Sequence, residues 1–162
     1  MWRGHMRKEE MCCFIGHRHV KNEEAIRQKI RAIVTTLVRE RRIYTFLFGS
    51  RSRFDDLCHE VVTEIRVQYP EIRRVYVRAE FPVITAQYES YLLQRFEKTV
   101  YPDCVKGAGR AAYIKRNQYM VDQSAVCVFY CWENTLDRSK SGTRIALTYA
   151  EARGGEILRI CE

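Results

Sequence analysis

The feature that most constrains the fold of this chain is a series of short, nearly continuous apolar runs. Residues 125–131, AVCVFYC, form the most continuous of them, while 11–16, MCCFIG, and 43–49, IYTFLFG, each end in glycine. Apolar runs of this length without polar alternation are typical of strands that are buried on both faces of a sheet. Because parallel sheets covered by helices contain such strands, the runs predict an α/β fold.

Helical patterns separate the runs. Residues 22–40, NEEAIRQKIRAIVTTLVRE, begin with Asn22 as an expected N-cap, carry acids in the first turn and place their apolar residues on one helical face. Four further helices are predicted, at 52–68, 87–97 and 110–124 and from Ser141 to a glycine C-cap at Gly154 and Gly155. We expect an irregular connection at 98–109.

Strands that alternate with helices through short connections form parallel sheets with right-handed crossovers. Five strands are predicted, at 11–16, 43–49, 73–79, 125–131 and 156–160. We therefore expect a Rossmann-like, doubly wound α/β fold, with a mostly parallel five-stranded sheet and helices on both faces. The favoured strand order is 3-2-1-4-5, in which the winding reverses between the first strand and the fourth.

Length and composition fit one cytoplasmic domain. At 162 residues, 46% hydrophobic and 30% charged, the chain suits a single globular domain, expected at 11–162 behind a polar lead-in at 1–10. No apolar run reaches the roughly 18 residues of a membrane-spanning helix, and the polar start lacks the apolar core of a signal peptide. The seven cysteines are an odd number without a CxxC pair, so neither a disulfide framework nor a zinc knuckle is predicted.

The net charge of +8 indicates an anionic partner. Clustered Lys and Arg would favour nucleic acid, but here the basic residues are spread along the chain and mixed with acids. The densest basic stretch is 39–42, RERR, at the end of a predicted helix, where cations also complement the helix dipole. The charge therefore favours anionic ligands in general over DNA in particular.

The topology predicts where such a ligand binds. In an open parallel sheet, ligands occupy the crevice beyond the carboxyl ends of the strands, at the point where the winding reverses. The loops there combine glycines, arginines and hydroxyl side chains at helix N-termini, whose free N–H groups favour phosphate. The predicted nucleotide-binding residues are Gly16, His17, Arg18, Gly49, Ser50, Arg51, Asp55, Arg116, Asn117, Ser141, Gly142 and Thr143.

Several of these residues also have structural explanations. A strand-end glycine is common turn chemistry, and Ser141 suits any helix start. Ser52 with Asp55 three residues later forms a capping box, so Asp55 is a cap partner or a ligand contact. Arg116 and Asn117 border the apolar face of their helix, where they either serve the ligand or hydrogen-bond the helix to a strand-end loop.

Motifs for metal binding and catalysis are missing. His17 and His19 form an H-x-H, but no matching Cys, His or acidic pattern accompanies them, so no metal site is predicted. The chain has no G-x-S-x-G elbow, no Walker A lysine and no HExxH, and GSRSRFDD lacks the third glycine of a dinucleotide fingerprint. The sequence thus predicts a ligand class without a reaction.

Four blocks taken together resemble a known family. CCFIGHRHV, TFLFGSRSRFD, IKRNQYMVDQSAVCVFY and SGTRIALTYAEARGGEI, in this order, are similar to the YpsA-like proteins of the SLOG superfamily, which also includes the Lonely Guy (LOG) and DprA groups. The match covers nearly the whole chain, and GHR and RNQYMVD…SGT are its most specific parts. The resemblance implies a nucleotide- or nucleotide-sugar-binding domain, with loops at 16–18, 49–55, 116–117 and 141–143 as the binding site.

The chain departs from the LOG pattern at its catalytic acid. LOG proteins hydrolyse the N-glycosidic bond of nucleoside monophosphates with an Arg, which Arg116 matches, and a P-G-G-x-G-T-x-x-E motif. Here Ser141-Gly142-Thr143 keeps only the G-T end, and Ala146 stands in place of the Glu. Glu80 and Glu133 are the candidates for a substitute. Ser50-Arg51 also stands where YpsA-like chains carry smaller residues, which would narrow the pocket or clamp a phosphate.

Three hypotheses follow from the residues and the resemblance. The first is a binding protein for a small-molecule ligand such as a nucleotide, NAD or ADP-ribose. The second is a LOG-like phosphoribohydrolase, and the third, less favoured, is a DprA-like nucleic-acid-binding protein. An edge strand and an aromatic residue such as Trp132 would allow a homo-oligomer.

Overall fold

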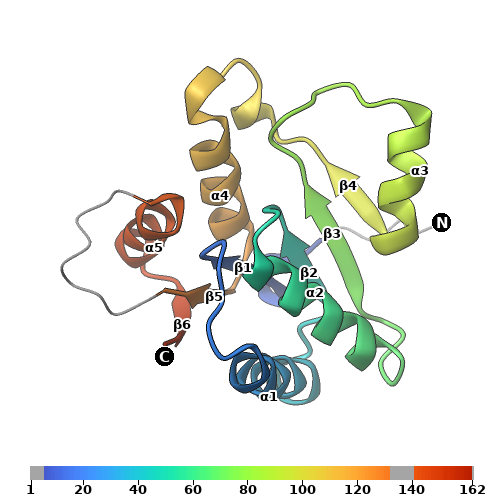
Figure 1. The fold of residues 1–162 in the computed structure, drawn as a ribbon, viewed down its shortest axis with the longest axis vertical. Helices are drawn as coiled ribbons and strands as arrows, with labels where there is room; N and C mark the ends of the chain where they lie inside the picture. Colours follow the sequence, from blue (N-terminus) through green and yellow to red (C-terminus); the bar gives the residue numbers. More distant parts are fainter. Residues whose placement is uncertain (1–5, 132–140, 162) are drawn as a thin grey trace.

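The computed structural model describes residues 6–131 and 141–161. Within them the strands are β1 (Met11–Gly16), β2 (Thr45–Phe48), β3 (Arg73–Val77), β4 (Lys98–Val100), β5 (Val126–Tyr130) and β6 (Glu156–Ile160) (Figure 1). The α-helices are α1 (Glu23–Arg41), α2 (Arg53–Arg66), α3 (Ala86–Arg95), α4 (Ala112–Gln123) and α5 (Gly142–Arg153). Short 3-10 helices are η1 (Lys8–Glu10), η2 (Asp103–Val105) and η3 (Gly109–Ala111).

The strands form one six-stranded sheet in the order β4-β3-β2-β1-β5-β6. Every neighbouring pair is parallel. The winding runs from β1 outward to β4, then reverses and continues on the other side of β1 with β5 and β6. The Rossmann-like, doubly wound fold is thus confirmed, and the five predicted strands lie in the predicted order.

The prediction of five strands was wrong by one. β4 lies inside the stretch expected to be an irregular connection and pairs with β3, Val75 opposite Lys98 and Val77 opposite Val100. It is three residues long, sits at the edge of the sheet and is only partly buried, so it carries no apolar run that would predict it. β4 is therefore a strand because it pairs with β3, and its own sequence has no hydrophobic pattern that indicates one.

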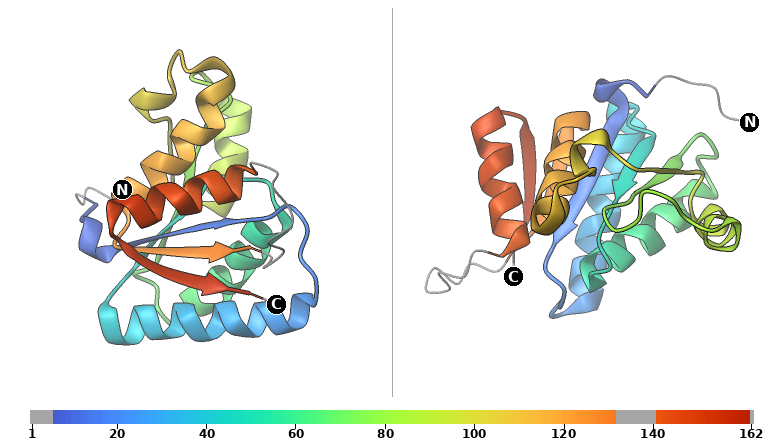
Figure 2. Two further views of the ribbon diagram at one scale, coloured as in Figure 1. Left: turned by 90° about the vertical axis from the view of Figure 1, so that its left-hand side faces the viewer. Right: turned by 90° about the horizontal axis from the view of Figure 1, so that it is seen from above.

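Helices cover both faces of the sheet. α1, α2 and α3 pack on one face, where β1 contributes Cys12 and Phe14, and α4 and α5 pack on the other, where β1 contributes Cys13 and Ile15. Figure 2 shows α1 and α5 on opposite sides of β5 and β6. Because both faces are covered, the central strands are apolar at nearly every position, which produces the continuous runs in the sequence. None of the described helices is long and apolar enough to cross a membrane.

Hydroxyl side chains begin three of the helices. Ser52, Thr85 and Ser141 each accept a hydrogen bond from the backbone N–H three residues later, at the starts of α2, α3 and α5. The capping role predicted for Asn22 is wrong: its side chain makes no cap hydrogen bond, and its backbone lies in the left-handed region with φ of 50°. Asparagine tolerates this conformation better than most residues, so Asn22 sets the turn into α1.

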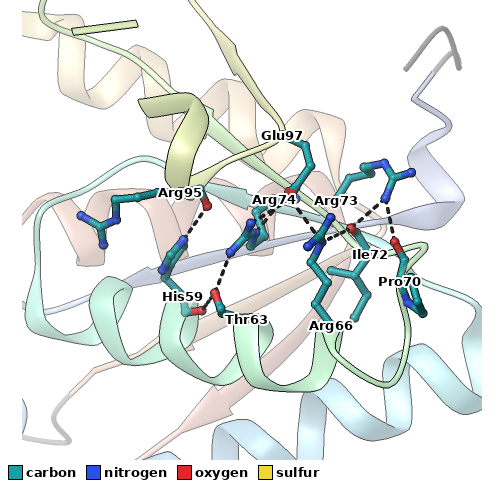
Figure 3. Close-up of polar contacts among 9 residues, drawn as sticks. All are labelled: His59, Thr63, Arg66, Pro70, Ile72, Arg73, Arg74, Arg95 and Glu97. Atoms are coloured by element: carbon teal, nitrogen blue, oxygen red, sulfur yellow. Dashed lines mark hydrogen bonds and ion pairs between the residues drawn. The ribbon is translucent and has the colours of Figure 1, made fainter. Parts of the chain in front are cut away.

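A charged network fixes the β4 edge to the rest of the domain (Figure 3). The guanidinium of Arg74 in β3 contacts Glu97 twice, with Nε 3.2 Å from Oε2 and Nη2 2.8 Å from Oε1. Its Nη1 donates to Thr63 Oγ1 of α2 at 2.9 Å. Arg66 lies 3.2 Å from the same carboxylate. The Arg74 and Glu97 side chains are only 10% and 18% exposed, so water screens the pair weakly. His59 Nε2 also donates to the Arg95 carbonyl at 2.9 Å, which closes the end of α3.

The Glu97 carboxylate makes the free energy of unfolding depend on pH in the acidic range. Burial acts to raise its pKa, but hydrogen bonds from Arg74 and the charges of Arg74 and Arg66 outweigh burial, so the pKa is lowered. The stabilisation is therefore full above the unfolded glutamate pKa of about 4.3 and is lost as pH falls through the lower folded value.

We therefore expect Glu97→Gln to lower the free energy of unfolding by about 1–3 kcal/mol at pH 7, measured by urea unfolding. The difference from wild type should shrink as pH falls from 5 toward 3. Glu71→Gln, which changes an exposed glutamate nearby, should have little effect at any pH. An equal loss at pH 7 and pH 3 would contradict the ionic role of Glu97.

Candidate functional site

An open cavity of about 1400 Å³ lies beyond the carboxyl ends of the central strands. The loops after β1 and β2, the N-terminal half of α4 and the start of α5 surround it, so it spans the point where the winding reverses. Its lining includes all of the residues predicted to bind a nucleotide except Asp55. The topology thus brings together four segments that are far apart in the sequence.

The loop after β1 is held by close packing. Gly16 lies where a Cβ atom would come 2.3 Å from Cδ1 of Phe54, a fully buried ring, so packing alone requires glycine there. The His17 N–H donates to the Tyr130 carbonyl at 3.3 Å, and the carbonyl of Arg18 accepts from the Arg53 N–H at 2.9 Å. The loop therefore joins β5 to the start of α2 and leaves the Arg18 side chain exposed at the cavity.

Asp55 is buried behind the loop that follows β2, on the side away from the cavity. The side chain is 4% exposed and does not line the cavity, so the structure assigns it to support of the loop. Burial raises the pKa of the carboxyl, and the charge of Arg116 and the nearby backbone N–H groups of Gly49 and Ser50 act in the opposite direction. The Asp55 N–H donates to Ser52 Oγ at 3.0 Å, which is the Ser half of the predicted capping box.

Arg116 is the central residue of the site. It is 5% exposed, its Nη1 donates to the Gly49 carbonyl, and its Nε donates to Asn117 Oδ1 at 3.0 Å. The predicted link between this helix and a strand-end loop is therefore present, and Arg116 also lines the cavity. Gly49 has no room for a side chain, because a Cβ would lie 2.6 Å from Arg116 Cδ and 2.7 Å from Met120 Sδ.

The guanidinium of Arg116 has no ionic partner in the described part of the chain. No carboxylate oxygen there lies within 4.0 Å of it, and Nη2 makes no hydrogen bond with a described residue. Its ring contact is with Tyr113, whose centroid is 5.5 Å from the guanidinium carbon. Burial lowers the pKa of Arg116, opposed by Asp55, Tyr76 and other groups at longer range, as expected for a cation that lacks a close anion.

The start of α5 combines a cap with open space. Ser141 Oγ accepts from the Arg144 N–H at 3.2 Å, so the simple capping role is present. A Cβ on Gly142 would meet no atom within 4 Å, although glycine is a poor helix former, so packing does not require this glycine. Ala146, one turn further, is 1% exposed and packs in the core between α5 and the sheet, facing away from the cavity.

The cavity wall also contains residues that the sequence patterns did not single out. Tyr76, Tyr113, Arg144, Glu151 and Arg159 line it. Glu80, which was a candidate acid from the sequence, lines the cavity as well. Arg51 lines it while its Nη2 donates to Tyr88 Oη of α3 at 3.3 Å, so this arginine spans toward the β3 side. Trp132 and Glu133 lie outside the described residues.

His17 and His19 both line the cavity without forming a metal cluster. Across residues 6–131 and 141–161, no three His, Cys, Asp or Glu side chains are grouped so that they could hold a metal ion. The His17 ring instead packs edge-on against Tyr130, with centroids 6.2 Å apart.

Alanine substitutions at Gly16 and Gly142 test whether each glycine is required by packing of the fold. Gly16→Ala places a methyl group against the buried Phe54 ring, and we expect it to lower the free energy of unfolding by about 1–3 kcal/mol. Gly142→Ala meets no atom and improves helix propensity, so it should leave stability unchanged or raise it by up to about 1 kcal/mol. Denaturant unfolding measures both, and a clear destabilisation by Gly142→Ala would show that the fold itself needs this glycine.

Comparison with known proteins leaves the family open. No protein-family model matches the chain, and no curated protein matches it.

Proposed function

We propose that this chain binds a nucleotide or a nucleotide-derived ligand, such as NAD or ADP-ribose, in the cavity at the carboxyl edge of its sheet. No reaction is assigned to it. The observation that carries the proposal is the Arg116 guanidinium, 5% exposed, at the cavity wall with no carboxylate within 4.0 Å among the described residues.

An anionic ligand would compensate for the burial of this charge. A buried cation without a partner costs several kcal/mol, and its hydrogen bonds to a carbonyl and an amide offset only part of that. A phosphate oxygen at Nη2 would supply both a hydrogen bond and the missing opposite charge. Arginine also suits phosphate better than lysine does, because its planar donors match the phosphate oxygens.

The start of α5 offers a second place for an anion. The first N–H groups of a helix have no partner within it, and the helix dipole favours negative charge there. The open space at Gly142 would let a ligand approach this backbone closely, and Arg144 and Arg159 line the same end of the cavity. Two anion-binding places in one cavity suit a ligand with a diphosphate.

Binding is favoured over the two alternatives. For a LOG-like hydrolase, the position that would hold the acid is Ala146, which is buried in the core, so a carboxylate there would not reach a ligand. For a nucleic-acid-binding protein, the basic residues would have to gather on one surface, yet they are spread along the chain and mixed with acids, and Arg41 in the densest basic stretch is ion-paired with Glu156. The resemblance to YpsA-like proteins supports the binding role through Arg116 and the Ser141–Thr143 segment.

A thermal-shift series with ADP, NAD and ADP-ribose tests the proposal. A ligand at a hundred times its Kd should stabilise the fold by about 2.7 kcal/mol, which raises Tm by about 5–10 °C for a chain of this size. Arg116→Gln should weaken binding by roughly tenfold or more, because a charged hydrogen bond to the ligand is lost. Arg110→Gln changes an exposed arginine near the start of the same helix and should bind like wild type.

A second variant guards against a folding defect in Arg116→Gln. Gly142→Asp places a carboxylate at the N-terminus of α5, which stabilises the helix by about 0.3–1 kcal/mol but repels an anion. We expect this variant to melt no lower than wild type and to lose the ligand-induced shift. Flat melting curves for all three ligands with wild-type protein, or full shifts with Gly142→Asp and Arg116→Gln, would refute the proposal.

A further inference from the structure

The two ends of the cavity differ in chemistry. The start of α5 supplies arginines and backbone N–H groups, whereas the end beside β3 and the start of α4 is lined by Tyr76, Glu80 and Tyr113. A smaller hollow lies against this second end, and Tyr76, Glu80 and Arg116 belong to its lining too. A ligand that spans the cavity would therefore meet cations at one end and aromatic rings with a carboxylate at the other.

Tyr113 presents an aromatic ring that is fixed but not covered. Its hydroxyl donates to Glu80 Oε1 at 3.0 Å, and the Arg116 guanidinium carbon lies 5.5 Å from its ring centroid. These two contacts limit rotation of the side chain, yet the residue is 52% exposed. A held, half-exposed tyrosine in a cavity gives a flat apolar surface on which a nucleobase can stack.

Glu80 presents hydrogen-bond acceptors beside that ring. Its Oε1 accepts from Tyr113, and its Oε2 accepts no hydrogen bond from a described residue. Glu80 and Glu151 are the carboxylates among the described lining residues, so Glu80 is the acidic group at this end. Carboxylates at the edge of a nucleotide site accept hydrogen bonds from ribose hydroxyls.

We propose that Tyr113 and Glu80 form the nucleoside subsite of this cavity, where the base stacks on Tyr113 and the ribose hydroxyls donate to Glu80. The proposal rests on the proposed function, because it needs a ligand whose phosphate is at Arg116. Since Arg116 contacts the Tyr113 ring, a phosphate on its guanidinium lies about one sugar away from a base on that ring. The preferred ligand class is therefore a ribonucleoside 5′-diphosphate or a compound that contains one.

Titration calorimetry with pyrophosphate, ADP and 2′-deoxy-ADP tests this assignment. Wild type should bind ADP at least about tenfold more tightly than pyrophosphate, since stacking of one base contributes on that scale. Tyr113→Ala should lower ADP affinity far more than pyrophosphate affinity, whereas Tyr113→Phe should retain most of the ADP affinity. Tyr91→Ala is the matched control, because Tyr91 is 51% exposed on α3 and is absent from the lining.

The role of Glu80 has a separate readout. Wild type should prefer ADP to 2′-deoxy-ADP, and Glu80→Gln should bring the two affinities close together without lowering pyrophosphate affinity. An ADP preference that Glu80→Gln leaves intact, or a wild type that does not distinguish the two nucleotides, would overturn the ribose contact.

The outcomes also separate this subsite from the proposed function. If pyrophosphate and ADP bind with equal affinity, or if Tyr113→Ala weakens both alike, the nucleoside subsite is refuted while an anion site remains. If neither probe binds wild-type protein at millimolar concentration, the proposed function fails, and the subsite fails with it.

Discussion

The hydrogen bond from Arg116 to the carbonyl of Gly49 is the interaction on which the site depends. It joins α4 to the loop after β2, which are distant in the sequence. On the other side of the loop, the buried Asp55 carboxyl lies close to the backbone N–H groups of Gly49 and Ser50, which act to lower its pKa. A side chain at Gly49 would clash with Arg116, so the glycine allows the arginine to lie against the loop. The loop conformation, Gly49 and the buried guanidinium therefore depend on one another.

Asp55 and Arg116 carry incompletely satisfied polar groups, which a purely structural arrangement would avoid. Among the described residues, Oδ1 of Asp55 is buried without a hydrogen-bond partner, and Nη2 of Arg116 has no acceptor. Such groups call for an explanation, and for Arg116, which lines the cavity, a bound anion supplies one. By contrast, at the β4 edge Arg74 is ion-paired with Glu97, and this pair anchors β3, which contains Tyr76 and leads into the loop with Glu80 at the cavity.

The sequence predicted the fold better than the details of the site. Continuous apolar runs indicated the central strands, because burial on both faces leaves a pattern at every position, whereas β4 is defined by its pairing with β3 and leaves none. Strand ends and helix starts located the cavity, since topology alone brings them together. The contact between Tyr113 and Glu80 could not be predicted, because it depends on how two segments 33 residues apart pack against each other. The support role of Asp55 was missed because a capping-box pattern does not show which way the side chain is buried.

The central claim is that a buried guanidinium at the carboxyl edge of the sheet receives an anion. Its most direct test is a crystal of the protein soaked in selenate, with anomalous data collected at the selenium edge. The account predicts an anomalous peak within hydrogen-bonding distance of Nη2 of Arg116, present at selenate concentrations that leave the exposed arginines of α1 unoccupied. Peaks only at surface arginines, with none in the cavity, would contradict it.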